Sequence, residues 1–139
     1  MSPSPRIAVT GPDGFIAWHV RCAARARWGG DLVGLGPEVF ADPALLDAEL
    51  AEVDAVIHLA GVNRAHDVGE IEQVNPWLAE MLVGSLRRVG RSVPVVYGNS
   101  IHSQGDSPFG VAKRQAADIL RHGTDLVDVV MPNIFGENG

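Results

Sequence analysis

The sequence has little cysteine, no long apolar run and no excess of positive charge. Cys22 is the only cysteine among the 139 residues, which excludes an intramolecular disulfide, and its neighbours Ala23 and Ala24 predict that it packs on a helix face. No apolar run approaches the length that spans a bilayer, and residues 1–5 are too short and too polar for a signal peptide. We therefore expect a cytoplasmic protein with no membrane partner.

Lysine and arginine number 11 against 17 aspartates and glutamates, so the formal net charge is -6. The chain has no basic stripe that would release counterions from a nucleic acid, and DNA and RNA are not expected partners. Four histidines, His19, His58, His66 and His122, show no spacing with cysteines or carboxylates that is typical of a metal site, so no metal is expected. His58 lies within an apolar run and is expected to be a hydrogen-bonded core residue.

Short apolar runs alternate with segments whose apolar residues recur at helical spacing. Strands are predicted at residues 6–10, 31–35, 54–60, 93–97 and 126–131, and helices begin at Phe15, after Asp42, near Pro76 and at Pro108. Such alternation favours parallel pairing through right-handed crossovers. The predicted fold class is α/β, a doubly wound parallel sheet of the Rossmann type. It is expected as one domain over residues 1–139, truncated after about five strands.

A glycine-rich turn joins the first predicted strand to the first predicted helix. Its pattern is Gly11-x-x-Gly14-x-x-Ala17, in which Gly11 permits a tight turn and Gly14 permits a pyrophosphate to approach the backbone. The amides of Phe15 and Ile16, in the first helical turn, could donate to phosphate oxygens with help from the helix dipole. The pattern between a strand and a helix predicts a nucleotide-binding site.

The choice between NAD and NADP usually depends on an acidic or basic residue after the second strand. Residues 34–37 carry neither charge, so the sequence does not distinguish the two cofactors. Glu38 is close enough to contact a cofactor, but a solvated surface position fits it better. Asp13, beside the glycine turn, could be either a helix cap or a cofactor contact.

Three stretches resemble a known family. They are His58-Leu-Ala-Gly-Val-Asn-Arg64, Asn99-Ser-Ile-His102 with Ser107-Pro-Phe-Gly-Val-Ala-Lys113, and Met131-Pro-Asn-Ile-Phe-Gly136. In this order and spacing they resemble the extended short-chain dehydrogenases/reductases, also called NAD-dependent epimerases/dehydratases, which mostly act on nucleotide sugars. Within that family the likeness is strongest to the reductase domain of CapF-type enzymes of capsular polysaccharide biosynthesis, which reduce a 4-keto nucleotide sugar. The resemblance covers residues 7–136.

The resemblance implies a role for particular residues. Ser100 and Lys113 match the catalytic serine and lysine of the family. The implied cofactor-binding residues are Gly11, Gly14, Phe15, Ile16, Asp42, Leu59, Ala60, Gly61, Asn75, Lys113, Pro132 and Asn133. Among them, Asp42 would meet the adenine amino group and Asn75 would stand at the start of the helix after the third strand. The resemblance thus implies an NAD(P)-binding domain, without the substrate-binding domain of the family.

One departure from the family concerns catalysis. Phe109 occupies the position of the tyrosine in the Tyr-x-x-x-Lys signature, whose phenol exchanges a proton with the substrate while a lysine four residues later lowers the phenol pKa. Phenylalanine has no proton to exchange, and general acid/base catalysis typically contributes about a hundredfold to ten-thousandfold in rate. His102 is the nearby titratable residue that could replace the phenol, although a packing role fits it too.

Three functions therefore remain open. The first is a dinucleotide-binding domain that resembles nucleotide-sugar epimerases and reductases and is redox-impaired as a standalone chain. The second is an active NAD(P)-dependent enzyme on a nucleotide sugar, completed by a partner chain or a dimer. The third is a non-redox role in binding, assembly or cofactor-independent catalysis. Because the fifth strand would leave an open sheet edge, a homo-oligomer or a partner chain is expected.

Overall fold

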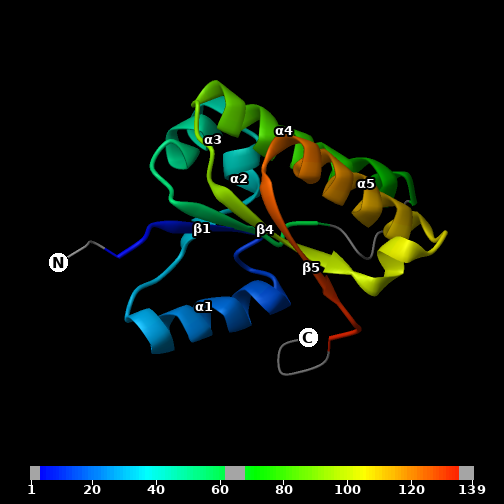
Figure 1. The fold of residues 1–139 in the computed structure, drawn as a ribbon, viewed down its shortest axis with the longest axis horizontal. Helices are drawn as coiled ribbons and strands as arrows, with labels where there is room; N and C mark the ends of the chain where they lie inside the picture. Colours follow the sequence, from blue (N-terminus) through cyan, green and yellow to red (C-terminus); the bar gives the residue numbers. More distant parts are fainter. Residues whose placement is uncertain (1–3, 62–67, 135–139) are drawn as a thin grey trace.

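The computed structural model describes residues 4–61 and 68–134 and contains one five-stranded parallel sheet. The strands are β1 (Ile7–Thr10), β2 (Val33–Leu35), β3 (Ala55–His58), β4 (Pro94–Ser100) and β5 (Asp125–Met131). Their order across the sheet is β2-β1-β3-β4-β5 (Figure 1). The chain therefore leaves β1 in one direction to form β2 and returns past it to form β3, which confirms the Rossmann-type α/β fold.

Helices cover both faces of the sheet, as Figure 1 shows. Helix α1 (Phe15–Trp28) lies alone on one face. The opposite face carries α2 (Pro37–Phe40), α3 (Pro43–Leu50), α4 (Val68–Arg88) and α5 (Pro108–Gly123). A short 3-10 helix, η1 (Ile101–Gln104), joins β4 to α5. Side-chain caps fix the starts of two α-helices: Asp42 accepts from the Leu45 amide at 3.3 Å, and Ser107 accepts from the Gly110 amide at 3.0 Å.

The hydrophobic core is divided by the sheet. The larger part joins α2–α5 to the sheet and includes the fully buried Leu46, Leu50, Leu82 and Leu120. The smaller part lies under α1 around Val9, with Ala17, Ala24 and Leu32. Small side chains on the inner face of α1 let that helix approach the sheet closely, which brings its first turn to the carboxyl ends of β1 and β3.

Two sequence predictions of local structure are wrong. Helix α4 begins at Val68 and contains Pro76, which was expected near its start. Val68, Ile71 and Val74 recur at helical spacing before Pro76, and a proline removes only one backbone donor from an otherwise continuous helix, so the helix extends further than predicted. Cys22 is exposed on α1, because the buried face of this helix passes through Ala17 and Ala24.

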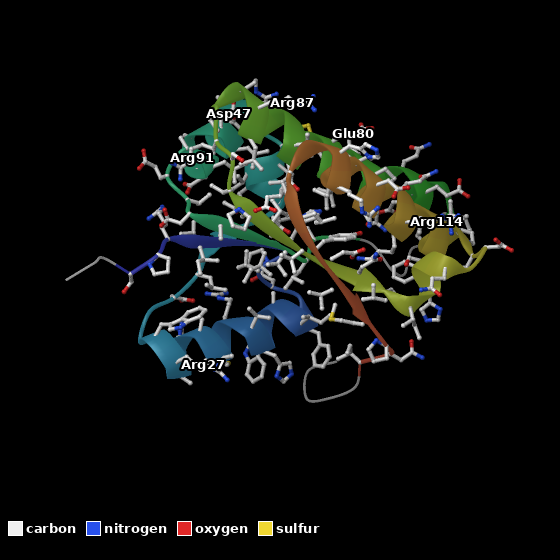
Figure 2. All side chains as sticks on the ribbon, in the orientation of Figure 1. Arg27, Asp47, Glu80, Arg87, Arg91 and Arg114 are labelled. Carbon is white, nitrogen blue, oxygen red and sulfur yellow. The ribbon has the colours of Figure 1, made fainter. Side chains whose placement is uncertain are left out.

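Polar side chains tie neighbouring helices together on the surface. Asp47 of α3 accepts from the Arg88 guanidinium of α4 at 2.8 and 2.9 Å. Arg114, which Figure 2 labels on α5, donates to the carbonyl oxygens of Ser103 at 2.8 Å and Gly105 at 3.2 Å. The second set of bonds fixes η1 against α5, so the side chains that η1 carries have a defined position.

Strand β5 forms one edge of the sheet and exposes apolar side chains. Val127, Val129 and Val130 are 51%, 41% and 44% exposed. Exposed apolar side chains on an edge strand are consistent with the expected association through this edge. The association itself stays a prediction. Of the helices in the described ranges, none combines the length and the apolar character that a bilayer span requires.

Candidate functional site

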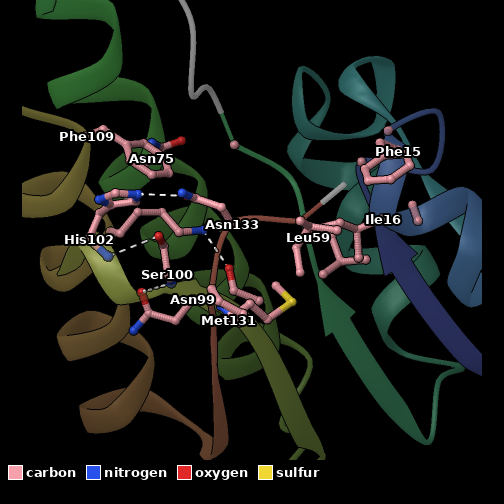
Figure 3. Close-up of a pocket in the computed structure, with 18 residues that line it drawn as sticks. Phe15, Ile16, Leu59, Asn75, Asn99, Ser100, His102, Phe109, Met131 and Asn133 are labelled. Carbon is pink, nitrogen blue, oxygen red and sulfur yellow. Dashed lines mark hydrogen bonds between the residues drawn. The ribbon is translucent and has the colours of Figure 1, made fainter. Parts of the chain in front are cut away.

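A cleft of about 660 Å³ opens at the carboxyl ends of β1, β3, β4 and β5. It lies where the strand order reverses between β1 and β3, the position at which open α/β sheets bind ligands. Its volume is within the range of small-molecule and cofactor sites. The lining residues are Gly11, Gly14, Phe15, Ile16, Ala17, Leu59, Gly61, Asn75, Gly98, Asn99, Ser100, His102, Phe109, Lys113, Met131, Pro132, Asn133 and Ile134 (Figure 3).

The glycine turn forms one wall of the cleft. Gly11 has a φ of +62°, and a Cβ on it would lie 3.0 Å from the Cα of Ala60. A Cβ on Gly14 would lie 3.3 Å from the carbonyl oxygen of Gly11. Gly14 is the N-cap of α1 and supplies no side-chain cap, and the amides of a first helical turn have no acceptor within the helix. This wall is therefore a backbone surface with positive electrostatic potential, suited to an anionic group.

A buried hydrogen-bond cluster supports this wall from below. The Thr10 hydroxyl oxygen accepts from the amides of Leu59 and Ala60, both at 2.9 Å, and lies 2.8 Å from Nδ1 of His58. Burial lowers the pKa of His58 to about 3, with the Lys113 charge acting in the same direction, so the ring is neutral. Because the hydroxyl oxygen already accepts two bonds, its proton goes to Nδ1, and His58 carries its own proton on Nε2. The expectation of a hydrogen-bonded core histidine agrees with this geometry.

The opposite wall contains the residues of η1 and the start of α5. The Ser100 hydroxyl oxygen accepts from the amide of His102 at 3.1 Å, and Nε2 of His102 lies 3.0 Å from the side-chain oxygen of Asn133. The rings of His102 and Phe109 lie side by side with their centroids 6.2 Å apart (Figure 3). Histidine is therefore the side chain that can exchange a proton next to the apolar ring of Phe109.

Lys113 forms the floor of the cleft between these walls. Its Nζ donates to the carbonyl oxygen of Gly98 at 2.6 Å and lies 4.4 Å from the ring centroid of Tyr97. Burial lowers the pKa of Lys113 to about 8, and the negative charge of Asp128 acts against this shift. The ammonium thus uses one of its three protons on the backbone and stays cationic at neutral pH.

The structure brings most of the residues implied by the family resemblance into this one cleft. Gly11, Gly14, Phe15, Ile16, Leu59, Gly61, Asn75, Ser100, Phe109, Lys113, Pro132 and Asn133 all line it. Asp42 and Ala60 do not: the Asp42 carboxylate caps α3, and the Ala60 amide bonds to Thr10 behind the wall. Asn75 is buried inside α4 and not at its start, because that helix begins seven residues earlier.

The charged residues near the turn take no part in the lining. Asp13 is exposed and makes no cap, since Gly14 is the N-cap of α1. The Glu38 carboxylate folds back over Gly36, where an added Cβ would lie 2.6 Å from its oxygen. His66 and residues 62–64 and 135–136 of the quoted stretches lie outside the described residues. Within the described part of the chain, no group of three metal-ligating side chains is close enough to hold a metal ion.

Sequence reasoning missed four lining residues: Gly98, Asn99, Met131 and Ile134. Gly98 and Asn99 lie near the end of β4. Met131 ends β5, and Ile134 follows it. The rule that ligands bind at the carboxyl ends of parallel strands could have indicated them. The support that Thr10 and Tyr97 give from behind the cleft has no signal in the sequence.

Comparison with known proteins gives one curated relative and many solved structures of the same fold. No family model matches the chain. The UDP-2-acetamido-2,6-beta-L-arabino-hexul-4-ose reductase of Pseudomonas aeruginosa is 33% identical over 138 residues, which is 95% of this chain and 36% of the relative. This chain therefore spans about a third of the length of that reductase.

Two solved structures show the same arrangement of strands and helices. The Bordetella bronchiseptica enzyme WbmH, in complex with NAD+, superposes with a TM-score of 0.78 at 18% identity, over 96% of this chain and 57% of that one. The capsular polysaccharide assembling protein CapF of Staphylococcus aureus has a TM-score of 0.75 at 23% identity, over 96% of this chain and 37% of that one. The solved structures show the fold, and the 33% identity with the reductase supports the extended short-chain dehydrogenase/reductase family, the NAD-dependent epimerases/dehydratases, which the three sequence stretches resemble.

Proposed function

We propose that this chain binds a nicotinamide dinucleotide in the cleft and serves as the dinucleotide-binding domain of a nucleotide-sugar epimerase or reductase. One observation carries the proposal: the glycine turn and the uncapped start of α1 share a single cleft with Ser100 and Lys113. In this proposal residues 1–139 form one such unit, because all the described strands belong to one sheet. The relative from Pseudomonas aeruginosa and the NAD+ complex of WbmH support it.

The cleft fits a dinucleotide at both ends. Gly11 and Gly14 leave space that a Cβ would fill, so a pyrophosphate could reach the amides of Phe15 and Ile16. Across the cleft, the Lys113 ammonium could donate to ribose hydroxyl groups with the protons that Gly98 does not use. A bound nicotinamide would supply or accept a hydride. Among the described residues, neither wall offers a charged side chain that selects NAD or NADP, so the proposal covers both cofactors.

We propose further that redox turnover of the chain is impaired. Tyr97 is the only tyrosine of the sequence, and it lies on the buried side of β4 with its pKa raised by burial and by the charge of Asp128. Phe109 lines the cleft without a proton to give. No phenol can therefore protonate a substrate oxygen here, and the missing acid costs about a hundredfold to ten-thousandfold in rate.

The experiment is isothermal titration of the purified chain with NADH, NADPH and a UDP-sugar, together with the absorbance of any copurified cofactor. Binding of either dinucleotide to the wild-type chain, without oxidation on addition of a UDP-4-keto sugar, is the expected result. A folded chain that binds neither dinucleotide would refute the proposal and favour a non-redox role in binding or assembly.

A second candidate, an active reductase, is favoured by the position of His102. Its Nε2 bonds to Asn133 and its ring lies beside Phe109, so an imidazolium at this position could protonate a carbonyl oxygen in place of the missing phenol. The carbonyl carbon would receive the hydride, and the product would be the alcohol with a neutral His102. The observation that carries this candidate is that the His102 ring lines the cleft.

The two candidates differ in the rate of cofactor oxidation. An active reductase oxidises NAD(P)H with a UDP-4-keto sugar, and His102→Gln lowers that rate about a hundredfold or more. His122→Gln is the matched control, because His122 is exposed on α5, does not line the cleft, and bonds through Nδ1 to the Asp118 carbonyl oxygen. Equal rates in the wild type and His102→Gln would rule out the histidine as the acid.

A further inference from the structure

Lys113 is the only lysine of the chain and one of its few buried polar side chains. It is 8% exposed, and its ammonium lies between the Gly98 carbonyl oxygen and the Tyr97 ring. Neither neighbour carries a formal charge. A buried ammonium without a counter-charge is costly, and such a group commonly loses its proton instead. The structure must therefore supply a negative charge nearby if Lys113 is to stay cationic.

Asp128 supplies that charge from β5. In the sheet register it is the direct partner of Tyr97, the residue whose ring Lys113 contacts. One carboxylate oxygen, Oδ2, accepts from the Asn99 side-chain amide at 3.3 Å and from the Arg121 guanidinium at 3.2 Å. The other oxygen, Oδ1, is buried and has no hydrogen-bond partner among the described residues. The carboxylate is thus held through Oδ2, whereas Oδ1 accepts no hydrogen bond from a described residue.

The titratable groups that face Lys113 come from three strands. From β3, His58 is neutral because burial lowers its pKa to about 3. From β4, Tyr97 is neutral because burial raises its pKa. From β5, Asp128 raises the pKa of Lys113, against the larger lowering by burial. Asp128 is therefore the anion among the groups that act on Lys113, and Arg121 behind it is a cation that opposes its effect.

We propose that Asp128 is a positioning residue, the counter-charge that keeps Lys113 in its ammonium form and anchored at the floor of the cleft. The side chain does not line the cleft, so its charge acts on a bound cofactor through Lys113. The consequence for cofactor binding rests on the proposed function, whereas the effect on Lys113 itself does not. Asn99 joins the two sides of this arrangement, since it lines the cleft and also holds the carboxylate.

The test is nuclear magnetic resonance of chain labelled with ¹³C-lysine, in which the single Lys113 Cε signal is followed from pH 6 to 11. The wild-type midpoint is expected near 8. Asp128→Asn should move the midpoint to lower pH, and Asp128→Glu should restore part of the difference. Arg121→Gln should move it to higher pH, because it removes a positive charge 3.2 Å from the carboxylate. Asp125→Asn removes the same charge from the exposed start of β5 and should leave the midpoint unchanged.

The proposal is overturned if the midpoint is the same in the wild type, Asp128→Asn and Arg121→Gln. It is overturned equally if Asp125→Asn lowers the midpoint as much as Asp128→Asn does, since a general loss of charge would then explain the shift. Because the Arg121 variant shifts the midpoint in the opposite direction, the proposal stays testable even if Asp128→Asn does not fold.

A second measurement connects Lys113 to the cofactor. The affinity for NADH, titrated between pH 7 and 10, should fall as pH rises through about 8 in the wild type, and at lower pH in Asp128→Asn. A midpoint shift without a matching change in the affinity profile would contradict the role in cofactor binding. If the wild type binds no NADH at any pH, the proposed function fails while the midpoint measurement still decides the role of Asp128.

Discussion

Replacement of Thr10 with valine removes one hydroxyl group and leaves the volume of the side chain almost unchanged. The hydroxyl makes three hydrogen bonds, to the amides of Leu59 and Ala60 and to Nδ1 of His58, and Thr10 and His58 are 0% and 1% exposed. Thr10→Val therefore leaves three polar groups without their partner and gains no compensating contact. The effect on the free energy of unfolding follows from these three bonds.

Each of the three bonds contributes about 1 kcal/mol net, and an unpaired buried acceptor adds a desolvation penalty of similar size. We therefore expect Thr10→Val to lower the free energy of unfolding by about 3 to 4 kcal/mol. With a urea dependence of about 1.5 kcal/mol per molar, the midpoint of urea unfolding should fall by about 2 M. Loss on this scale is a large part of the total stability of a small domain.

The assay is urea unfolding followed by circular dichroism at pH 7.5, with Thr124→Val as the matched control. Thr124 also has a hydroxyl in a partly buried position, but it makes a single bond, to the Leu120 carbonyl oxygen at 2.7 Å. The control should lose about 1 kcal/mol. If Thr10→Val loses no more than Thr124→Val, the hydroxyl does not support the cleft wall and the reasoning is refuted.

The remaining predictions concern pH and cofactor binding. Folding keeps His58 neutral down to about pH 3, whereas the unfolded chain takes up a proton near pH 6.5. Stability from this residue is therefore full above pH 6.5 and falls as the pH drops towards 3, by about 2 kcal/mol at pH 5. Urea unfolding at pH 7.5 and 5 should show that His58→Gln loses less stability on acidification than the wild type, and equal losses would contradict a buried neutral ring. Gly14→Val should weaken dinucleotide binding in a titration, because its side chain blocks the approach to the backbone, whereas Gly30→Val should not, since a Cβ on Gly30 meets nothing within 4 Å. Unchanged affinity in a folded Gly14→Val chain would exclude the glycine turn as the phosphate site.

Local patterns in the sequence were sufficient for the alternation of strands and helices along the chain and for the glycine turn before α1. A strand can be recognised from a short run of alternating or continuous apolar residues. The glycine turn can be recognised from three positions within seven residues. Parallel pairing then follows from chain connectivity and handedness. The start of helix α4 was predicted too late, because proline is common in the first turn of a helix, and only the tertiary structure shows that the helix continues through Pro76.

The sequence by itself therefore determined that strands and helices alternate, that a glycine turn opens α1 and that Phe109 stands four residues before Lys113. Tertiary structure alone decided which groups meet. Thr10 contacts His58 across 48 positions, and Asn99 contacts Asp128 across 29. Whether a buried lysine is cationic depends on the charge that the fold places opposite it, and no local pattern encodes such a distance. The charge state of Lys113 is thus a property of the assembled sheet, although the lysine itself is visible in the sequence.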